Sequence, residues 1–314
     1  MEPNNKSHPN EFILLGFADR PWLELPLFII LLITYPMAMM GNIAIILVSK
    51  LDPRLHSPMY FFLTNLSFLD MCYTTSIVPQ MLFNLGTSKK TISYMGCAVQ
   101  LYFFHIMGGT ECLLLAVMSF DRYVAICKPL HYTLIMNQCV CILLVATVWL
   151  MGCTVGLGQT TYIFSLDFCG PCEIDHFFCD LPPILALACG DTSHSEAAVF
   201  VAAILCISSP FLLIIASYGR ILAAVLIMPS PEGRQKALST CSSHLLVVTL
   251  FYGSGSVTYL RPKASHSPGV DKLLALFYTV VTSMLNPVIY SLRNKEVKTA
   301  LRKTLGKKNV LTHG

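Results

Sequence analysis

The chain has 314 residues, of which 54% are hydrophobic and only 12% charged, and its mean hydropathy is +0.64. Soluble domains carry about 25% charged residues, so this composition excludes an ordinary soluble protein and indicates a chain embedded in lipid. The formal net charge of +4 is small, and we expect no nucleic-acid partner.

The chain opens with a polar stretch, "MEPNNKSHPNEF", that contains no apolar signal-peptide region. The first apolar span is therefore expected to act as an uncleaved signal. We expect an N-terminal segment at 1–24, a membrane domain at 25–292, and a tail at 293–314 that contains a short amphipathic helix.

Seven apolar segments follow one another along the chain. Each is long enough for the ~20 residues that a membrane-spanning helix needs, and each is too long and continuous for a barrel strand. The sequence therefore predicts an all-α membrane protein, a seven-transmembrane helix bundle. The spans are expected at about 25–49, 58–83, 97–127, 139–161, 197–227, 237–260 and 272–292.

The loops predict how the bundle sits in the membrane. Lys and Arg gather in the loops of one side, from Lys50 to the tail, whereas the loop near 162–196 is acidic and has neither residue. Because basic loops stay in the cytoplasm, the N-terminus is expected to be extracellular and the C-terminus cytoplasmic. A glycosylation sequon at Asn5 fits this orientation.

Five of the 13 cysteines are expected in the oxidising compartment outside the cell. Cys97 begins the third span, and the others lie in the acidic loop. One bridge from Cys97 would pin that loop over the mouth of the bundle, whereas pairing within the loop alone would not; spacing does not choose between them. The loop cysteines are Cys169, Cys172, Cys179 and Cys189.

Two acids lie inside predicted spans, Asp70 in the second and Glu111 in the third. Ionisable groups in membrane spans are costly and commonly functional. The pair is expected either to hold a cation such as sodium or to share a proton. The alternative is that each acid is simply hydrogen-bonded to neighbouring polar side chains.

Polar residues recur at helical spacing in the third, sixth and seventh spans, so each set shares one face that looks into the bundle. Such stripes serve either as packing contacts between helices or as the lining of a cavity. We expect His244, Asn286 and Tyr290 to pack deep in the bundle. The residues expected to line a cavity near the outer end are His105, Gly108, Gly109, Cys112, Ala202, Cys206, Tyr252, Ser256, Tyr259 and Thr279.

The expected lining is mostly apolar with a few hydroxyls and one imidazole, the mixture of a small-molecule pocket. The outer part of the third span, from Tyr102 to Thr110, has no acid that would hold a cationic ligand. The ligand is therefore expected to be small and mostly neutral. We find no metal-protease, phosphate-loop or serine-hydrolase motif, so no enzyme activity is predicted and no cofactor beyond the possible sodium ion.

A charged pair, Asp121 and Arg122, ends the third span after a long apolar run. Its place near the inner face lets the arginine reach water. An arginine with two alternative partners is what a two-state switch needs, whereas a pair that merely caps the helix end would have no such role.

Several stretches resemble the hallmarks of vertebrate olfactory receptors, a family of rhodopsin-like (class A) G-protein-coupled receptors. The resemblance covers nearly the whole chain; Phe120 stands where the family usually has Tyr, and Ser283 where it often has Pro. The stretches are "LHSPMYFFLTNLSFLD" (55–70), "MSFDRYVAICKPLHY" (118–132), "SY" (217–218), "KALSTCSSHL" (236–245) and "SMLNPVIYSLRN" (283–294).

The resemblance implies an odorant receptor of the plasma membrane of olfactory cilia that activates a stimulatory heterotrimeric G protein and raises cAMP. Asp121 would hold Arg122 at rest and release it when the sixth helix swings outward. The resemblance also implies disulfides Cys97–Cys179 and Cys169–Cys189, with Cys97–Cys189 as an open alternative. Other residues implied in activation and coupling are Tyr123, Tyr218, His244, Asn286, Pro287 and Tyr290.

Three other classes of protein are alternatives to the receptor. A transporter or channel would commonly show internal repeats or rings of pore-lining charge, and an enzyme would need a catalytic constellation; the sequence has neither. A peptide receptor of the same fold would be expected to have a longer N-terminus or a more open mouth. No oligomeric state is predicted.

Overall fold

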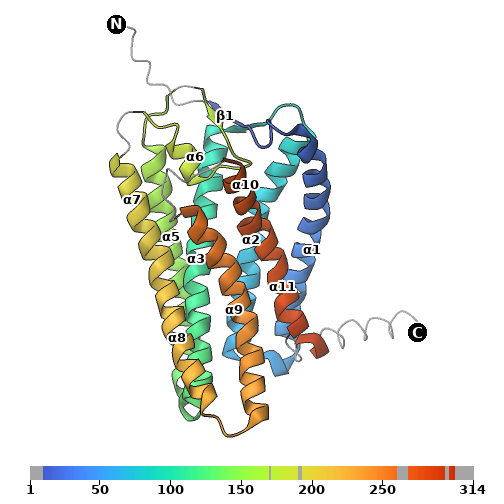
Figure 1. Ribbon diagram of the computed structural model, residues 1–314, viewed down its shortest axis with the longest axis vertical. Helices are drawn as coiled ribbons and strands as arrows, with labels where there is room; N and C mark the ends of the chain where they lie inside the picture. The colour runs from blue at the N-terminus through green and yellow to red at the C-terminus, as the bar shows by residue number, and fades with distance from the viewer. Residues whose placement is uncertain (1–9, 170, 190–192, 260–267, 294–296, 301–314) are drawn as a thin grey trace, which may run out of the picture.

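The computed structural model describes residues 10–169, 171–189, 193–259, 268–293 and 297–300. Within these ranges, seven long helical rods stand side by side (Figure 1). The rods are α1 (Glu24–Leu51), α2 (Pro58–Gly86), α3 (Tyr94–Cys127), α5 (Gln138–Phe164), α7 (Ser193–Ala203) continued by α8 (Ser209–Leu226), α9 (Pro231–Tyr259), and α10 (Pro268–Leu276) continued by α11 (Thr282–Arg293).

The rods differ from the predicted segments in their ends and in their regularity. α9 begins at Pro231 rather than near 237, because proline suits a first helical turn, where its missing N–H is not needed. The segments expected at 197–227 and 272–292 each contain a π-helical turn, Ile204–Ser208 (η4) and Phe277–Val281 (η6). A π turn adds a residue to the helix and shifts the faces of the parts on either side.

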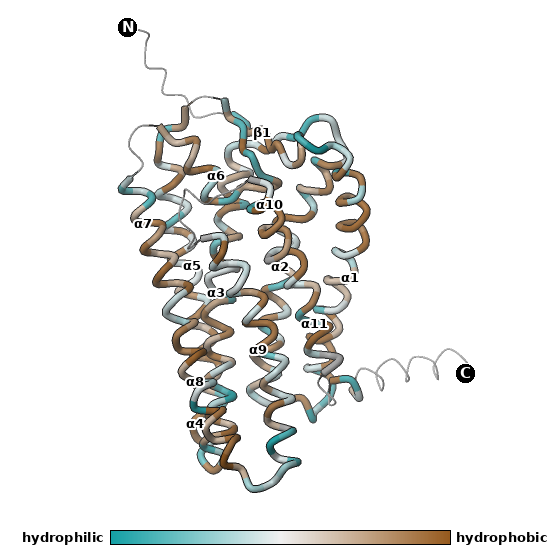
Figure 2. The backbone as a smooth tube through the Cα atoms, in the orientation of Figure 1, coloured by the Kyte–Doolittle hydropathy of each residue, from teal (hydrophilic) through white to brown (hydrophobic). Residues whose placement is uncertain are grey.

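Five helical stretches of the described chain are long and apolar enough to cross a membrane. Figure 2 shows hydrophobic residues along the rods and hydrophilic residues around the strand β1. Neither α2 nor α9 is among the five; α2 carries buried polar residues such as Asp70 and Asn84. The five are Pro21–Leu51, Tyr94–Cys127, Gln138–Phe164, Ser193–Leu226 and Gly269–Tyr290.

The central rod is α3, which contacts α2, α5, α8 and α9. Two glycines let α5 approach it closely. A Cβ on Gly156 would lie 2.7 Å from Cγ1 of Ile106, and one on Gly152 only 2.0 Å from Oγ1 of Thr110. Small residues at a helix interface allow backbones to come together, which is how membrane helices gain packing energy without a hydrophobic driving force between them.

A small sheet covers one end of the bundle and was not predicted. Strand β1 (Glu11–Leu14) pairs antiparallel with β2 (Thr91–Ser93) and parallel with β3 (Glu173–Ile174), so the order is β2-β1-β3. Phe12 of β1 is fully buried. The segment 1–24 is therefore not simply a polar tail, because its described part is built into the fold.

Short elements connect the rods, and the start of the tail folds back. Val297 and Ala300 are helical and buried against the bundle. The rest of the amphipathic helix expected at 293–314 lies outside the described residues. The connecting elements are η1 (Pro21–Leu23), η2 (Pro53–Leu55), η3 (Pro129–His131), α4 (Tyr132–Ile135) and α6 (Leu181–Leu185).

Candidate functional site: a cavity in the half of the bundle nearest the sheet

A cavity of about 110 Å³ lies among α3, α5, the α7–η4 segment and α9, under α6. It is small against the roughly 300–1,000 Å³ of typical small-molecule pockets. Most of its lining is apolar or aromatic. The lining residues are Tyr73, Phe104, His105, Gly108, Gly109, Cys112, Val155, Gln159, Leu181, Val199, Ala202, Ala203, Cys206, Ile207, Phe251, Tyr252 and Gly255.

The structure brings most of the expected lining residues together around this cavity. A Cβ on Gly108 would meet nothing within 4 Å, so this glycine leaves open space beside α3. Ser256 and Thr279 do not line the cavity, and the Thr279 hydroxyl donates to the Ala275 carbonyl at 2.6 Å. The side chain of Tyr259 lies outside the described part. The expected residues that do line it are His105, Gly108, Gly109, Cys112, Ala202, Cys206 and Tyr252.

Sequence reasoning missed the wall that α5 provides. Val155 and Gln159 of this helix reach the cavity, and so does Leu181 of α6. One signal was present, because Gln159 is the only amide side chain in the apolar run 139–161. A polar group in a membrane span usually faces the protein interior.

The polar groups of the wall differ in how far their hydrogen bonds are satisfied. The Tyr252 hydroxyl donates to the Cys112 carbonyl at 2.8 Å, and its ring stacks on Phe211. By contrast, Nδ1 of His105 is buried and has no hydrogen-bond partner in the part of the chain that the structure describes. Nδ1 of His105 is therefore available to a ligand, whereas the Tyr252 hydroxyl already donates its proton to a backbone carbonyl.

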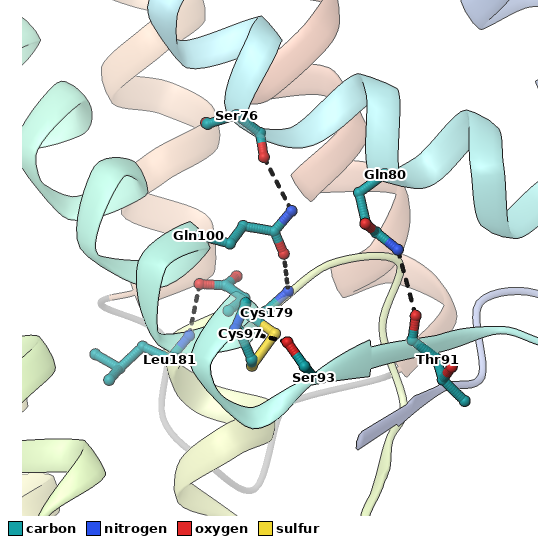
Figure 3. Close-up of a disulfide and its surroundings, with 10 residues drawn as sticks. Ser76, Gln80, Thr91, Ser93, Cys97, Gln100, Cys179 and Leu181 are labelled. Atoms are coloured by element: carbon teal, nitrogen blue, oxygen red, sulfur yellow. Dashed lines mark hydrogen bonds between the residues drawn. A yellow bond between two sulfur atoms is a disulfide. The ribbon is translucent and has the colours of Figure 1, made fainter. Parts of the chain in front are cut away.

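The roof of the cavity is tied to α3 by covalent and hydrogen bonds. Cys97 is disulfide-bonded to Cys179, and Cys169 to Cys189, the pairing that the resemblance implies. Gln100 of α3 accepts from the Cys179 N–H at 2.9 Å and donates to the Ser76 carbonyl at 3.0 Å (Figure 3). These bonds fix the loop directly above the cavity.

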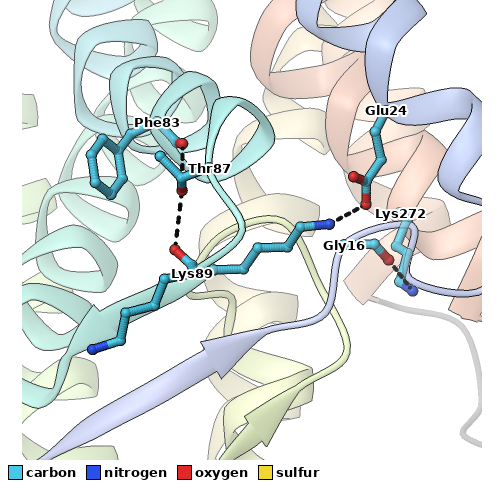
Figure 4. A network of polar contacts seen from close by, with 7 residues as sticks. Gly16, Glu24, Phe83, Thr87, Lys89 and Lys272 are labelled. Atoms are coloured by element: carbon cyan, nitrogen blue, oxygen red, sulfur yellow. Dashed lines mark hydrogen bonds and ion pairs between the residues drawn. The ribbon is translucent and has the colours of Figure 1, made fainter.

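A lysine joins the sheet, the loop and α10. Nζ of Lys272 donates to the Gly16 carbonyl at 2.7 Å (Figure 4) and pairs with Oδ1 of Asp175 at 2.5 Å. Lys272 is only 4% exposed. Its ammonium therefore holds three segments that are far apart in the sequence.

The acid pair lies deeper, between α2, α3 and α11. Asn286 donates from Nδ2 to both carboxylate oxygens of Asp70, at 2.9 and 3.2 Å. Oε1 of Glu111 is buried and lacks a hydrogen-bond partner among the described residues. For Asp70, the contact with Asn286 fits the alternative of simple hydrogen bonding to a neighbouring side chain. For Glu111, the unpartnered oxygen remains available to a further group.

The charged pair lies at the end of the bundle away from the sheet. Nη2 of Arg122 is 3.1 Å from Oδ2 of Asp121, and Tyr132 of α4 donates to Oδ1 of Asp121 at 2.8 Å. Burial raises the pKa of Tyr132, and the Asp121 carboxylate raises it further. The hydroxyl therefore stays protonated and keeps donating to the acid.

Further polar groups surround this pair. The Tyr218 hydroxyl lies 2.8 Å from Nδ1 of His244, while Nε2 of His244 and the Tyr290 hydroxyl are buried without partners in the described chain. Tyr123 packs beside Tyr218 in a small apolar cluster. Pro287 lies within α11 and contacts α1, since a Cβ on Gly41 would be 3.0 Å from its Cγ. Asn5 lies outside the described residues.

The fold defines the class of protein. The structure is similar to the crystal structure of squid rhodopsin, with a TM-score of 0.74, 20% identity, and coverage of 90% of this chain and 81% of that one. This likeness shows the helical bundle of the rhodopsin type.

The sequence defines the family. The family model described as olfactory receptor matches residues 31–308. The chain is 53% identical to putative olfactory receptor 2B3 of Homo sapiens over 97% of each chain, and 55% identical to olfactory receptor 2C3 of Homo sapiens, covering 96% of this chain and 94% of that one. The protein belongs to the olfactory receptor family.

Membership establishes the general character of the molecule. It is a multi-pass plasma-membrane receptor and not an enzyme. The family implies a small-molecule ligand and a G-protein partner.

Proposed function

We propose that this receptor binds a small, largely neutral volatile organic compound in the cavity and then activates a stimulatory heterotrimeric G protein of the olfactory type, raising cAMP. The observation that carries the proposal is the mostly apolar cavity under the tied roof, with His105 Nδ1 unpartnered within the described wall. It lies toward one end of the bundle, and Arg122 toward the other. Ligand and G protein would thus act on opposite sides of the membrane.

The proposal includes seven membrane crossings, with the N-terminus outside. Strand β1 and the end of α11 lie at opposite ends of the bundle, as an odd number of crossings requires (Figure 1). The basic loops lie at the α11 end, and basic loops mark the cytoplasmic side. α2 and α9 are less apolar than the other rods, but their buried polar groups face neighbouring helices rather than lipid.

The wall favours a neutral ligand. None of the described lining residues is Asp, Glu, Lys or Arg, so the cavity offers no counter-ion to a charged group. His105 and Gln159 instead offer hydrogen bonds to one polar group on an apolar body. Replacing His105 by Ala should weaken potency about fivefold or more, because a hydrogen bond of ~1 kcal/mol is lost.

A cAMP reporter assay on cells expressing the receptor, with a panel of diverse volatiles, tests this. Tyr259→Phe should also shift the response. Thr279→Val is the matched control, because Thr279 lies outside the lining and its hydroxyl bonds its own helix. If His105→Ala reaches the surface and keeps the potency of every activating odorant, the cavity is not the binding site.

For coupling, we propose that Arg122 exchanges partners. At rest it pairs with Asp121, as described above. Two buried polar atoms nearby, Nε2 of His244 and the Tyr290 hydroxyl, lack partners in the described chain, and each such group costs about 1–3 kcal/mol. An arrangement in which the sixth and seventh helices move and Arg122 turns inward would satisfy them. Arg122→Ala should therefore abolish odorant-evoked cAMP while surface staining stays normal, and an unchanged response would remove Arg122 from the mechanism.

For the acid pair, we propose that Asp70 and Glu111 hold a sodium ion or share a proton. Two buried carboxylates at similar depth cannot both stay charged without such compensation, and the unpartnered Glu111 oxygen fits either group. Asp70→Asn and Glu111→Gln should each change basal cAMP or abolish its dependence on sodium concentration. If both variants behave like the wild type, the acids serve only in packing.

A further inference from the structure

A second hollow lies on the flank of the bundle, between α5 and α7. Its volume is about 200 Å³. Gln159 of α5 and Val199 of α7 line both this groove and the central cavity. These two side chains therefore border both spaces.

Small residues form the outer part of the groove. A Cβ on Gly158 would meet nothing within 4 Å, and Ala198 faces it from α7 and is exposed. Towards the sheet, the groove ends where the Tyr162 hydroxyl lies 3.1 Å from Oγ of Ser195, which bridges the two helices. The gap is therefore bounded at one end and free of bulk at its entrance.

The roof, by contrast, is closely packed. Phe178 and Cys179 are fully buried, and Leu181 is 2% exposed. The disulfide to Cys97 holds this loop in place. So does the Lys272 clamp, the pair of contacts that the Lys272 ammonium makes with the Gly16 carbonyl and the Asp175 carboxylate. Within the described chain, a ligand arriving from water above would have to open this covalently tied layer, whereas a ligand dissolved in the membrane meets the groove directly.

Gln159 stands at the neck between groove and cavity. It is half-buried, and its amide makes no hydrogen bond within the described chain. An amide offers two donors and one acceptor, and within the bilayer core no water is at hand to pair with them. A passing molecule with a hydroxyl or carbonyl group would supply the missing partner.

We propose that the ligand enters from the lipid of the outer leaflet through the gap between α5 and α7, and that Gln159 selects small apolar molecules carrying one hydrogen-bonding oxygen group. This inference rests on the proposed function. It predicts that the route controls how fast the ligand arrives and leaves, while Gln159 also contributes to which ligand is held.

The route is tested by filling the groove from either wall with Gly158→Phe or Ala198→Phe. The matched control is Gly253→Phe on α9, since Gly253 is also exposed with nothing within 4 Å of its Cβ. G-protein activation is followed in perfused cells with an activating compound from a panel of medium-chain alcohols, aldehydes and ketones. Onset and washout should both slow about tenfold in the groove variants, a barrier increase of ~1.4 kcal/mol, with steady-state potency unchanged.

Wild-type rates in either groove variant at the cell surface would overturn the lateral route. So would a loss of potency with unchanged rates, which would place these residues in the binding wall. Slowing of the Gly253→Phe control to the same degree would also count against it. If the wild-type receptor responds to other volatiles but to no compound of this panel, selection of an oxygen group fails; if it responds to no volatile at all, the proposed function fails instead, so the two failures are distinguishable.

Selection by Gln159 is tested with Gln159→Leu, which keeps the approximate size and removes the amide. Potency for the alcohol or carbonyl compound should fall about fivefold, the worth of one neutral hydrogen bond. Leu157→Met on the exposed neighbouring face of α5 is the control. Unchanged potency in Gln159→Leu would exclude Gln159 as a specificity residue.

Discussion

The Lys272 clamp gives the most sharply defined prediction. Lys272→Met keeps the apolar stem of the side chain but removes the ammonium that bonds the Gly16 carbonyl and pairs with Asp175. A hydrogen bond to a charged group is worth about 1.5–3 kcal/mol. The pair with Asp175 adds little, because the Asp175 side chain is 48% exposed to screening solvent.

Hydrogen exchange of the purified receptor measures this loss locally. The N–H groups of Leu15 and Gly16 donate to the carbonyls of Ile174 and His176, so they exchange only when this segment opens. A loss of ~2 kcal/mol in Lys272→Met corresponds to about 30-fold faster exchange at these amides. Asp175→Asn should accelerate it no more than about fivefold.

Lys89→Met is the matched control. Nζ of Lys89 pairs with Glu11 of the same sheet at 3.4 Å, but its side chain is 73% exposed, so exchange should change by less than about twofold. Equal exchange at Gly16 in Lys272→Met and Lys89→Met would refute the reasoning, since burial would then not have strengthened the Lys272 contacts.

Two further predictions concern packing and pH. Gly156→Ala should lower thermal stability and surface expression by pushing α5 off Ile106, at a cost of ~1–3 kcal/mol, whereas Gly158→Ala, which meets open space, should not; equal melting temperatures would contradict this. Burial lowers the pKa of His176 by more than the Asp180 carboxylate raises it. In the opened loop His176 therefore takes up a proton near pH 6.5, whereas in the closed loop it stays neutral. The closed loop loses stability as the pH falls below that value. Exchange of the loop amides, corrected for intrinsic rates, should accelerate on acidification in the wild type and not in His176→Gln.

The helices were predictable because each has a local signal. An apolar run of ~20 residues indicates a spanning helix wherever it occurs, and the expected ranges overlap all seven rods. Their ends depend on caps that the hydropathy pattern does not show. Ser93 accepts from the Gly96 N–H and so starts α3 before 97, and Asn137 accepts from Val140 in the same way at α5.

The sheet and the clamp were not predictable from local pattern. Strand β1 has four residues, and its partners at 91–93 and 173–174 are shorter still. Such strands are defined by their pairing with distant segments rather than by their own periodicity. Lys272 is only the first residue of the span expected at 272–292, and nothing near it in the sequence shows that Gly16 and Asp175 reach it.

The cavity wall was predictable where α3 and α9 form it. His105, Gly108 and Tyr252 stand out because a polar or small residue interrupts an apolar helix face. Val155 does not, since one more apolar residue in an apolar run carries no sign of whether it faces lipid or ligand. Gln159 did carry such a sign, and it lies where the cavity meets the flank.

The central position of β1 has a consequence for how the receptor is made. The strand is synthesised before both of its neighbours in the sheet, and in the proposed orientation the second neighbour, β3, reaches the lumen only after the fourth rod has been inserted into the membrane. Phe12 therefore lacks part of its final packing until about half of the chain has been synthesised. Any delay in inserting the early rods would leave this apolar segment exposed to chaperones. A bulky fusion placed immediately before residue 11 would obstruct the pairing of β1 with β2 and β3.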